Sequence, residues 1–358
     1  MSMLQIDQVS KLYRTSGFGG GLTPALRKVS FDIDTGEVVT LIGESGSGKT
    51  TLGKIVLGLI SASSGRIVFD GADISAFGRA QLREYYRHVQ GVFQDPFSSY
   101  NPIYKADRAF ELLRDVYFSH LSRPAWEDKI DEAMHAVSLN PGDVLNKYPH
   151  QLSGGQQQRM LIARALLLDV KLLVADEVIS MLDASTRVDV LNLLVSLKRA
   201  GLGILFITHD LSLGNYVSDR TVILRHGAIA EMGPTVQVFG NPQHPYTKML
   251  LAAVPQLHKK WQQPTDGMEA IAADGAPILS AAVSGTPDAP VTGPSRRAAG
   301  AGSRAAGAGR RAAGAGRRAA APPLSMQPPP LVECEKGHFV AEPEPQSRAP
   351  VPSPSPEP

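Results

Sequence analysis

Short apolar runs separated by polar and glycine-rich turns dominate the first part of the chain. Residues 3–9 alternate between apolar and polar, and residues 36–43 (GEVVTLIG) end in an apolar run just before a glycine-rich turn. Both patterns predict strands. Residues 51–60 then have helical spacing, and residues 65–71 have the pattern of another strand. A buried strand that leads through a loop into a helix is a βα unit.

The pattern changes between residues 96 and 152. Helical spacing with mixed charges is found at residues 79–86 and 126–138, and no strong β pattern interrupts this part of the chain. Apolar strands return at residues 171–176, 203–208 and 221–224, with a helix predicted at residues 191–200. We therefore predict an α/β fold in which a mostly parallel, doubly wound sheet carries an inserted helical subdomain.

Composition separates a C-terminal segment of another kind. Of the 27 prolines, 17 lie after residue 262. Residues 296–320 repeat RRAAGAG with seven arginines and no acid, and two glycines per repeat argue against a coiled coil. We expect this tail to be disordered. The glycine-rich residues 17–21 are interpreted as a flexible connection.

Charge and cysteine content exclude several classes of protein. The net charge is +2, so no overall basic field indicates nucleic acid, and a single cysteine excludes a disulfide scaffold. The longest apolar stretch, residues 165–182, contains four charged residues, and the N-terminus lacks a signal-peptide pattern. We expect a soluble protein that needs partners if it works at a membrane.

One glycine-rich turn matches the pattern G-x-x-x-x-G-K-[ST]. The predicted phosphate-binding residues are Gly43, Glu44, Ser45, Gly46, Ser47, Gly48, Lys49, Thr50 and Thr51. Backbone N–H groups in such a loop surround phosphate oxygens, Lys49 reaches the β- and γ-phosphates, and the Thr50 hydroxyl binds Mg²⁺. The alternative is a chance glycine-rich turn. The predicted strand before it and the predicted helix after it argue against this alternative.

Two adjacent acids follow the apolar strand at residues 171–175. Asp176 at the strand end is placed to hold Mg²⁺ near the phosphate loop. Glu177 beside it is placed to orient or deprotonate an attacking water. The alternative is a surface acidic pair, which the buried character of the strand disfavours.

A third motif indicates the family. Residues 152–156 read LSGGQ, and with it the chain resembles the ATP-binding subunits of ABC transporters over most of residues 1–258. The family's other motifs match Gln94 (Q-loop), Asp183 (D-loop), His209 (switch histidine) and Tyr13 (adenine stacking). Alone, each has a simpler interpretation: a helix N-cap at Ser153, a core histidine, a loop amide or a packed tyrosine. Their order along one chain favours the family.

The resemblance implies a P-loop NTPase (RecA-like) core and a mechanism. Two such subunits pair head to tail around two ATP molecules, and the signature residues of one, here Ser153, Gly154, Gly155 and Gln156, contact the nucleotide of the other together with Asp183. Glu177 is the implied base, assisted by His209, Gln94 and Lys49. Mg²⁺ would be held by Thr50, Gln94 and Asp176.

Three further segments resemble the peptide/nickel permease branch, at residues 93–102, 147–159 and 240–251. The implied function is ATP-driven import of di- or oligopeptides. The implied partners are a second, different ATPase subunit, two membrane permease subunits and, indirectly, an extracytoplasmic solute-binding protein, and the implied location is the cytoplasmic side of the membrane. Nickel or oligosaccharide import, a soluble ATPase of translation or DNA repair, and a regulatory subunit that hardly turns over are the alternatives.

Two departures from the branch stand out. Val178 occupies the position after the glutamate where the family usually has proline, which removes no functional group. Cys334 is the single cysteine in a region where the branch has several, so we do not expect an iron–sulfur site. We predict an ATP-binding domain over residues 1–258 (core 1–94 and 166–240, helical subdomain 95–165) and a low-complexity tail over residues 259–358. For the arginine repeat we favour a solvated linker over a site for anionic membranes or nucleic acid.

Overall fold

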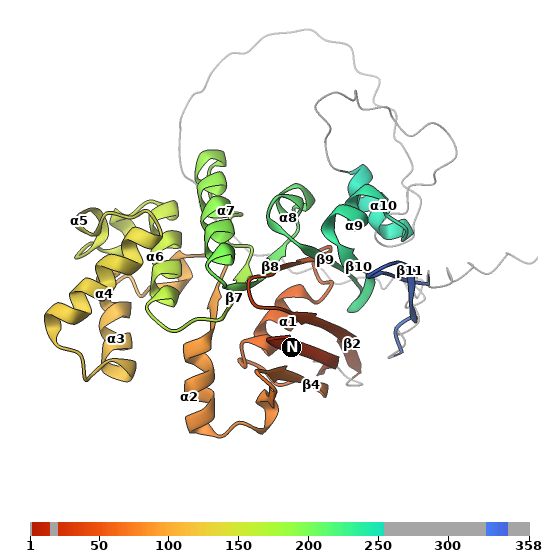
Figure 1. Cartoon of the computed structure of the whole chain (residues 1–358), viewed down its shortest axis with the longest axis horizontal. Helices are drawn as coiled ribbons and strands as arrows, with labels where there is room; N and C mark the ends of the chain where they lie inside the picture. Colours follow the sequence, from red (N-terminus) through yellow and green to blue (C-terminus); the bar gives the residue numbers. More distant parts are fainter. Residues whose placement is uncertain (1, 15–20, 254–326, 343–358) are drawn as a thin grey trace, which may run out of the picture. The chain divides into compact units, whose positions relative to one another are not determined.

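The computed structural model describes residues 2–14, 21–253 and 327–342 (Figure 1). Its elements in chain order are β1 (Leu4–Arg14), β2 (Leu22–Ile33), β3 (Val38–Ile42), α1 (Lys49–Val56), β4 (Ser64–Phe69), β5 (Ala72–Asp73), η1 (Ile74–Ala76), α2 (Arg79–His88), β6 (Val89–Val92), η2 (Phe97–Ser99), α3 (Arg108–Tyr117), α4 (Arg123–Ala136), α5 (Pro141–Val144), η3 (Pro149–Gln151), α6 (Gly154–Leu166), β7 (Leu172–Asp176), α7 (Ala184–Arg199), β8 (Gly203–Thr208), α8 (Leu211–Val217), β9 (Arg220–Arg225), β10 (Ala228–Pro234), α9 (Thr235–Gly240), α10 (Pro245–Ala252), β11 (Leu331–Glu335) and β12 (His338–Ala341).

The main sheet has eight strands in the order β11-β12-β10-β9-β3-β8-β7-β6. Strands β9, β3, β8, β7 and β6 pair in parallel, whereas β10, β12 and β11 continue the sheet with antiparallel pairs. Every residue of β3, β7 and β8 is buried, because these strands are nearly continuous apolar runs. The predicted mostly parallel, doubly wound sheet is confirmed.

Alternate residues of the central strands serve two different cores. On β8, Ile204 and Phe206 pack with residues of α6 and α7, whereas Leu205 and Ile207 pack with α1. Figure 1 shows α1 and α7 on opposite sides of the sheet. Because both faces are covered, the carboxyl ends of the strands are the part of the sheet left open to a ligand.

A second, smaller sheet contains the first strands of the chain. Its order is β2-β1-β4-β5, and all its pairs are antiparallel. Leu4, Ile6 and Val9 of β1 are buried in the same apolar cluster as Leu52 of α1. The sequence predicts these strands but does not separate them from the main sheet.

Helices α3 to α6 follow β6 and precede β7 in the chain, and they lie together in space (Figure 1). No strand occurs from Phe93 to Lys171. Trp126 of α4 is 1% exposed, and its ring lies 5.3 Å from that of Phe118 between ring centroids. Trp126 belongs to the same buried apolar cluster as Leu173 of β7 and Phe206 of β8, so the insert packs as part of the core on one face of the main sheet. The predicted helical insert is confirmed, while its exact limits stay predictions.

The C-terminal hairpin of β11 and β12 corrects one prediction. The tail was expected to be disordered throughout, but residues 331–341 form two strands, and β12 pairs with the edge of β10. His338 and Ala341 of the hairpin are buried, and Leu331 packs against the apolar cluster of the main domain. The prediction of disorder is wrong for this segment.

Other predictions for the tail fall outside the part of the chain that the structure describes. These are the predictions for residues 259–326, which include the arginine repeat, and for residues 343–358. The prediction for residues 17–20 of the glycine-rich connection also lies outside it. Among the described residues, no helix combines the length and the apolar character that crossing a bilayer requires.

Candidate functional site

The loop of residues 43–48 joins the end of β3 to the start of α1 and closes around the amine of Lys49. This amine donates to the carbonyl oxygens of Gly43 at 2.6 Å and Glu44 at 2.9 Å. The Ser47 N–H donates to the same Glu44 carbonyl at 3.1 Å. Burial lowers the pKa of Lys49, although nearby carboxylates act in the opposite direction. The loop therefore holds a positive charge at its centre, at the N-terminal end of a helix.

Two glycines of this loop differ in the space around them. Gly48 has a φ of +107°, and a Cβ there would lie 2.5 Å from the Ala25 carbonyl oxygen and 2.7 Å from a methyl carbon of Leu26. Gly46 has a φ of +81°, but a Cβ there would meet nothing within 4 Å. The absence of a side chain at Gly48 lets the loop pack against β2, whereas Gly46 has free space beside it.

Thr50 and Asp176 bring two oxygen donors together beside the loop. The Thr50 hydroxyl, on α1, donates to Oδ1 of Asp176 at 3.5 Å. Asp176 ends β7 and is 6% exposed, and burial raises the pKa of its carboxyl group while the hydrogen bond from Thr50 acts in the opposite direction. A hydroxyl and a carboxylate are hard oxygen ligands of the kind that Mg²⁺ prefers.

Glu177 and His209 meet at the ends of neighbouring parallel strands. Nδ1 of His209, which follows β8, lies 3.2 Å from Oε1 of Glu177, which follows β7. Glu177 has a φ of +50°, a left-handed conformation that costs a non-glycine residue about 1–2 kcal/mol. Its N–H donates to the Ile207 carbonyl at 2.9 Å, which helps to hold this conformation. A strained backbone conformation thus occurs at the residue whose carboxylate contacts the histidine.

A cavity of about 410 Å³ opens between these groups. Its lining consists of Ala25, Ser45, Gly46, Gly48, Lys49, Thr50, Thr51, Glu177 and His209. The volume lies within the range of small-molecule sites, about 300–1,000 Å³. One cavity thus contains the predicted phosphate loop, the predicted base and the predicted switch histidine.

The LSGGQ residues lie outside the lining of this cavity, at the start of α6. The Ser153 hydroxyl accepts from the Gln156 N–H at 3.2 Å, and the Gln156 side chain accepts from the Ser153 N–H at 2.9 Å, so the two residues form a capping box. A Cβ on Gly155 would lie 2.5 Å from the Thr186 methyl group, so this glycine allows close packing against α7. The simpler interpretation of Ser153 as an N-cap is correct, and it leaves a further role open.

Asp183, Gln94 and Tyr13 also lie apart from the cavity lining. Asp183 caps α7 and accepts from both the N–H and the hydroxyl of Thr186. Hydrogen bonds, of which that from the Ser185 hydroxyl has the largest effect, lower the pKa of its carboxyl group.

Gln94 is exposed after β6. Tyr13 is 44% exposed on β1, with the Lys11 amine 5.4 Å from its ring centroid. An exposed ring is available for stacking.

Two residues at the loop were not predicted from the sequence. The carbonyl of Ala25 faces Gly48, and the N–H of Gly227, in the turn between β9 and β10, donates to the Ser47 carbonyl at 3.1 Å. Both act through their backbone. A tight turn around Gly227 could have been predicted from the sequence, but its contact with Ser47 depends on the tertiary fold.

Two family models match the chain. The model described as "ABC transporter" matches residues 26–180, and the one described as "Oligopeptide/dipeptide transporter, C-terminal region" matches residues 230–276. A protein of Brucella ovis named for peptide import and ATP binding is 42% identical over 255 residues, which are 71% of this chain and 78% of the relative. The oligopeptide transport ATP-binding protein OppF of Haemophilus influenzae is 40% identical over 232 residues, 64% of this chain and 70% of the relative.

Solved structures agree with this similarity. A dimeric ATP-binding cassette in a post-hydrolysis state, bound to ADP and Pi, superposes with a TM-score of 0.58 at 28% identity, over 65% of this chain and 99% of that one. A component of an ABC transporter complex from Clostridium perfringens gives a TM-score of 0.58 at 27% identity, over 67% of this chain and 91% of that one.

Substitution of the two loop glycines by alanine separates close packing from backbone strain. Both variants place a Cβ at positive φ, but only Gly48→Ala forces it against Ala25 and Leu26. We expect Gly48→Ala to lower the free energy of unfolding by about 3 kcal/mol and Gly46→Ala by about 1 kcal/mol. Urea unfolding followed by far-UV circular dichroism measures both, and equal losses would contradict the packing role of Gly48.

Proposed function

Because the chain belongs to the ABC transporter family of ATP-binding proteins, we propose that it is the ATP-hydrolysing subunit that drives an importer of di- or oligopeptides. The observation that carries this proposal is the convergence of Lys49, Thr50, Glu177 and His209 on one cavity at the carboxyl ends of parallel strands. This is the place where open α/β sheets bind ligands.

The phosphate loop would bind the β- and γ-phosphates. The buried Lys49 amine is held by two backbone carbonyls and is available as a donor to phosphate oxygens. Helix α1 begins at this residue, so its N-terminal partial positive charge adds to the attraction. Gly46 leaves open space where a side chain would compete with the nucleotide. Tyr13, exposed on β1, would stack on the adenine.

Mg²⁺ fits the oxygen donors beside the loop. Thr50 and Asp176 would hold it, and Gln94 would contribute from the loop after β6. When bound, the ion neutralises charge on the phosphates. Burial keeps the pKa of Asp176 raised, although the hydrogen bond from Thr50 and the charge of Lys49 act in the opposite direction.

Glu177 would accept the proton of the attacking water, and His209 would orient the carboxylate. Their 3.2 Å contact supports this pairing, and the ring would also donate to the γ-phosphate or the water. Such sites work mainly through positioning and charge stabilisation.

The signature residues Ser153–Gln156 and Asp183 would complete the nucleotide site of a second ATPase subunit. Their position outside the lining of this chain's own cavity supports that division of labour. A dimeric relative bound to ADP and Pi has the same fold. ATP would hold the two subunits together, and hydrolysis would release them, so that differential affinity drives a conformational cycle. We propose that the second subunit is a different ATPase chain.

The permease subunits would dock at a groove beside the helical insert. A cavity of about 450 Å³ lies there, lined by Ser99, Tyr100, Asn101, Tyr104, Lys105, Ala106, Arg108, Ala109 and Leu112. Tyr104 of this lining is 53% exposed, and its neighbour in sequence, Ile103, is 76% exposed. Apolar side chains at the rim of a groove fit a protein partner. The chain would then lie on the cytoplasmic face of the membrane, and the solute-binding protein would act through the permease.

The proposed peptide substrate follows from the second family match. Residues 230–276 match the C-terminal region of oligopeptide and dipeptide transporters, and the relatives from Brucella ovis and Haemophilus influenzae are named for peptide and oligopeptide transport. In such a transporter the permease and the binding protein would select the solute. A transport assay that compares peptides, nickel complexes and oligosaccharides would therefore distinguish these substrates.

Replacement of the proposed base tests the catalytic assignment. Glu177→Gln keeps the size of the side chain but cannot accept the proton, so we expect the rate of ATP hydrolysis to fall at least about 100-fold. Binding of ATP, measured by titration with a fluorescent analogue, should remain. Glu84→Gln, exposed on α2, is the matched control. Hydrolysis by Glu177→Gln at the wild-type rate would refute the role of Glu177.

Replacement of an exposed apolar residue tests the docking groove. Ile103→Asp places a charge at the proposed permease contact, and we expect its recovery with co-expressed permease subunits to fall about tenfold or more. Val236→Asp, at a position that is 82% exposed on α9, is the control and should be recovered like the wild type. If Ile103→Asp is recovered equally well, the permease docks elsewhere.

A further inference from the structure

We propose that Tyr246 is a positioning residue for the phosphate loop, and that the C-terminal hairpin anchors it. This inference rests on the proposed nucleotide-binding role of residues 43–51. Tyr246 is the second residue of α10, about 200 residues further along the chain than the loop, and is 3% exposed. Its hydroxyl accepts a hydrogen bond from the Glu44 N–H at 3.0 Å.

The contact fixes one peptide unit at the start of the loop from both sides. In the peptide unit that joins Gly43 to Glu44, the Glu44 N–H donates to the Tyr246 hydroxyl and the Gly43 carbonyl accepts from the Lys49 amine at 2.6 Å. A peptide unit held at both ends cannot rotate without breaking hydrogen bonds. The orientation of the following N–H groups, which would face the phosphates, depends on this fixed point.

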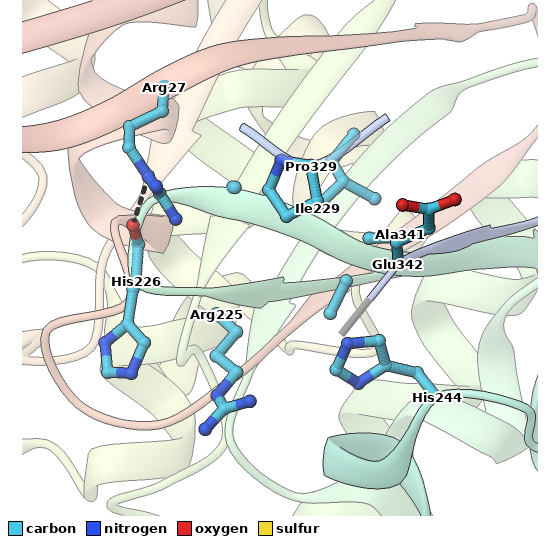
Figure 2. A pocket seen from close by; sticks show the side chains of 10 residues that line it. Arg27, Arg225, His226, Ile229, His244, Pro329, Ala341 and Glu342 are labelled. Carbon is cyan, nitrogen blue, oxygen red and sulfur yellow. Dashed lines mark hydrogen bonds between the residues drawn. The ribbon is translucent and has the colours of Figure 1, made fainter. Parts of the chain in front are cut away.

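The ring of Tyr246 is itself held in place. The Arg225 guanidinium lies 5.1 Å from its centroid, and the His244 ring meets it edge-on at 6.5 Å between centroids. The Tyr246 N–H donates to Nδ1 of His244 at 3.0 Å. Burial raises the pKa of the Tyr246 hydroxyl, so it stays neutral while it accepts from Glu44. Figure 2 shows the side chains of Arg225 and His244 near the same small cavity.

A buried carboxylate ties this segment to the end of the described chain. Glu231 of β10 accepts from the N–H groups of Gln243 at 2.9 Å and His244 at 3.0 Å. It also contacts Nε2 of His338 at 2.7 Å, and both side chains are fully buried. A buried carboxylate is costly without such partners. His338 lies on β12, so the hairpin provides one of the three groups that hold Glu231.

A continuous series of contacts therefore runs from the hairpin to the phosphate loop. It passes from His338 to Glu231, through the backbone and ring of His244, to Tyr246 and Glu44. The small cavity of about 20 Å³ in Figure 2 is lined on one side by His244 and on another by Ala341 and Glu342, which follow His338. The C-terminal segments are thus joined to the nucleotide site and not only to the edge of the sheet.

Tyr246→Phe tests the inference, because it removes the hydroxyl and keeps the ring. We expect the Kd for the fluorescent analogue mant-ADP to rise about fivefold, as loss of one neutral hydrogen bond predicts. The full chain is titrated well below its unfolding temperature, so that every variant is folded. A purely structural role would lower the unfolding temperature without changing Kd. Tyr117→Phe, which also loses a hydroxyl hydrogen bond but lies on α3, should bind like the wild type.

Two further variants make the outcomes distinguishable. Lys49→Ala should lose mant-ADP binding, and wild-type binding by this variant would refute the nucleotide site itself. If Lys49→Ala loses binding while Tyr246→Phe keeps the wild-type Kd, the positioning role is wrong. His338→Ala should raise Kd about two- to threefold by loosening the anchor, and the exposed Val332→Ala on β11 should not. An unchanged Kd in His338→Ala would overturn the part assigned to the hairpin.

Discussion

The proposed phosphate-binding role requires the backbone N–H groups of residues 43–48 to stay turned inward, and contacts from several surrounding elements hold this backbone. The loop is contacted by the carbonyl of Ala25 from β2, by the N–H of Gly227 from the turn between β9 and β10, and by the hydroxyl of Tyr246 from α10. Lys49 closes it from inside. Elements from both sheets and from the C-terminal part of the domain are therefore needed to shape six residues.

The chemistry beside the loop is a consequence of the parallel sheet. Strands β7 and β8 are neighbours with the same direction, so the residues that follow them, Glu177 and His209, meet at one edge. Their buried strands keep that edge fixed, and the helices on both faces leave it as the opening. The signature residues at the start of α6 belong to a different part of the fold and do not line this cavity.

Motifs with a local geometry could be predicted from the sequence. The phosphate loop, the acids after β7 and His209 follow strands that are recognisable as apolar runs, so their positions at the strand ends were predictable. The hairpin of β11 and β12 was not, because it is held by pairing with a distant strand and by burial of His338 and Ala341, whereas the low-complexity, proline-rich composition of the tail favoured disorder. The contact of Tyr246 with Glu44 was also missed, since it depends on tertiary folding and not on any local pattern.

Hydrogen exchange measured by mass spectrometry tests the central claim, that the loop of residues 43–48 is the nucleotide site. The full chain is compared with and without Mg²⁺ and ADP. The account predicts that nucleotide slows exchange in peptides that cover residues 43–51, since phosphate oxygens would bind these N–H groups. Peptides from α4, in the helical insert, should be unaffected. Unchanged exchange at residues 43–51 under saturating nucleotide, or protection confined to the insert, would contradict it.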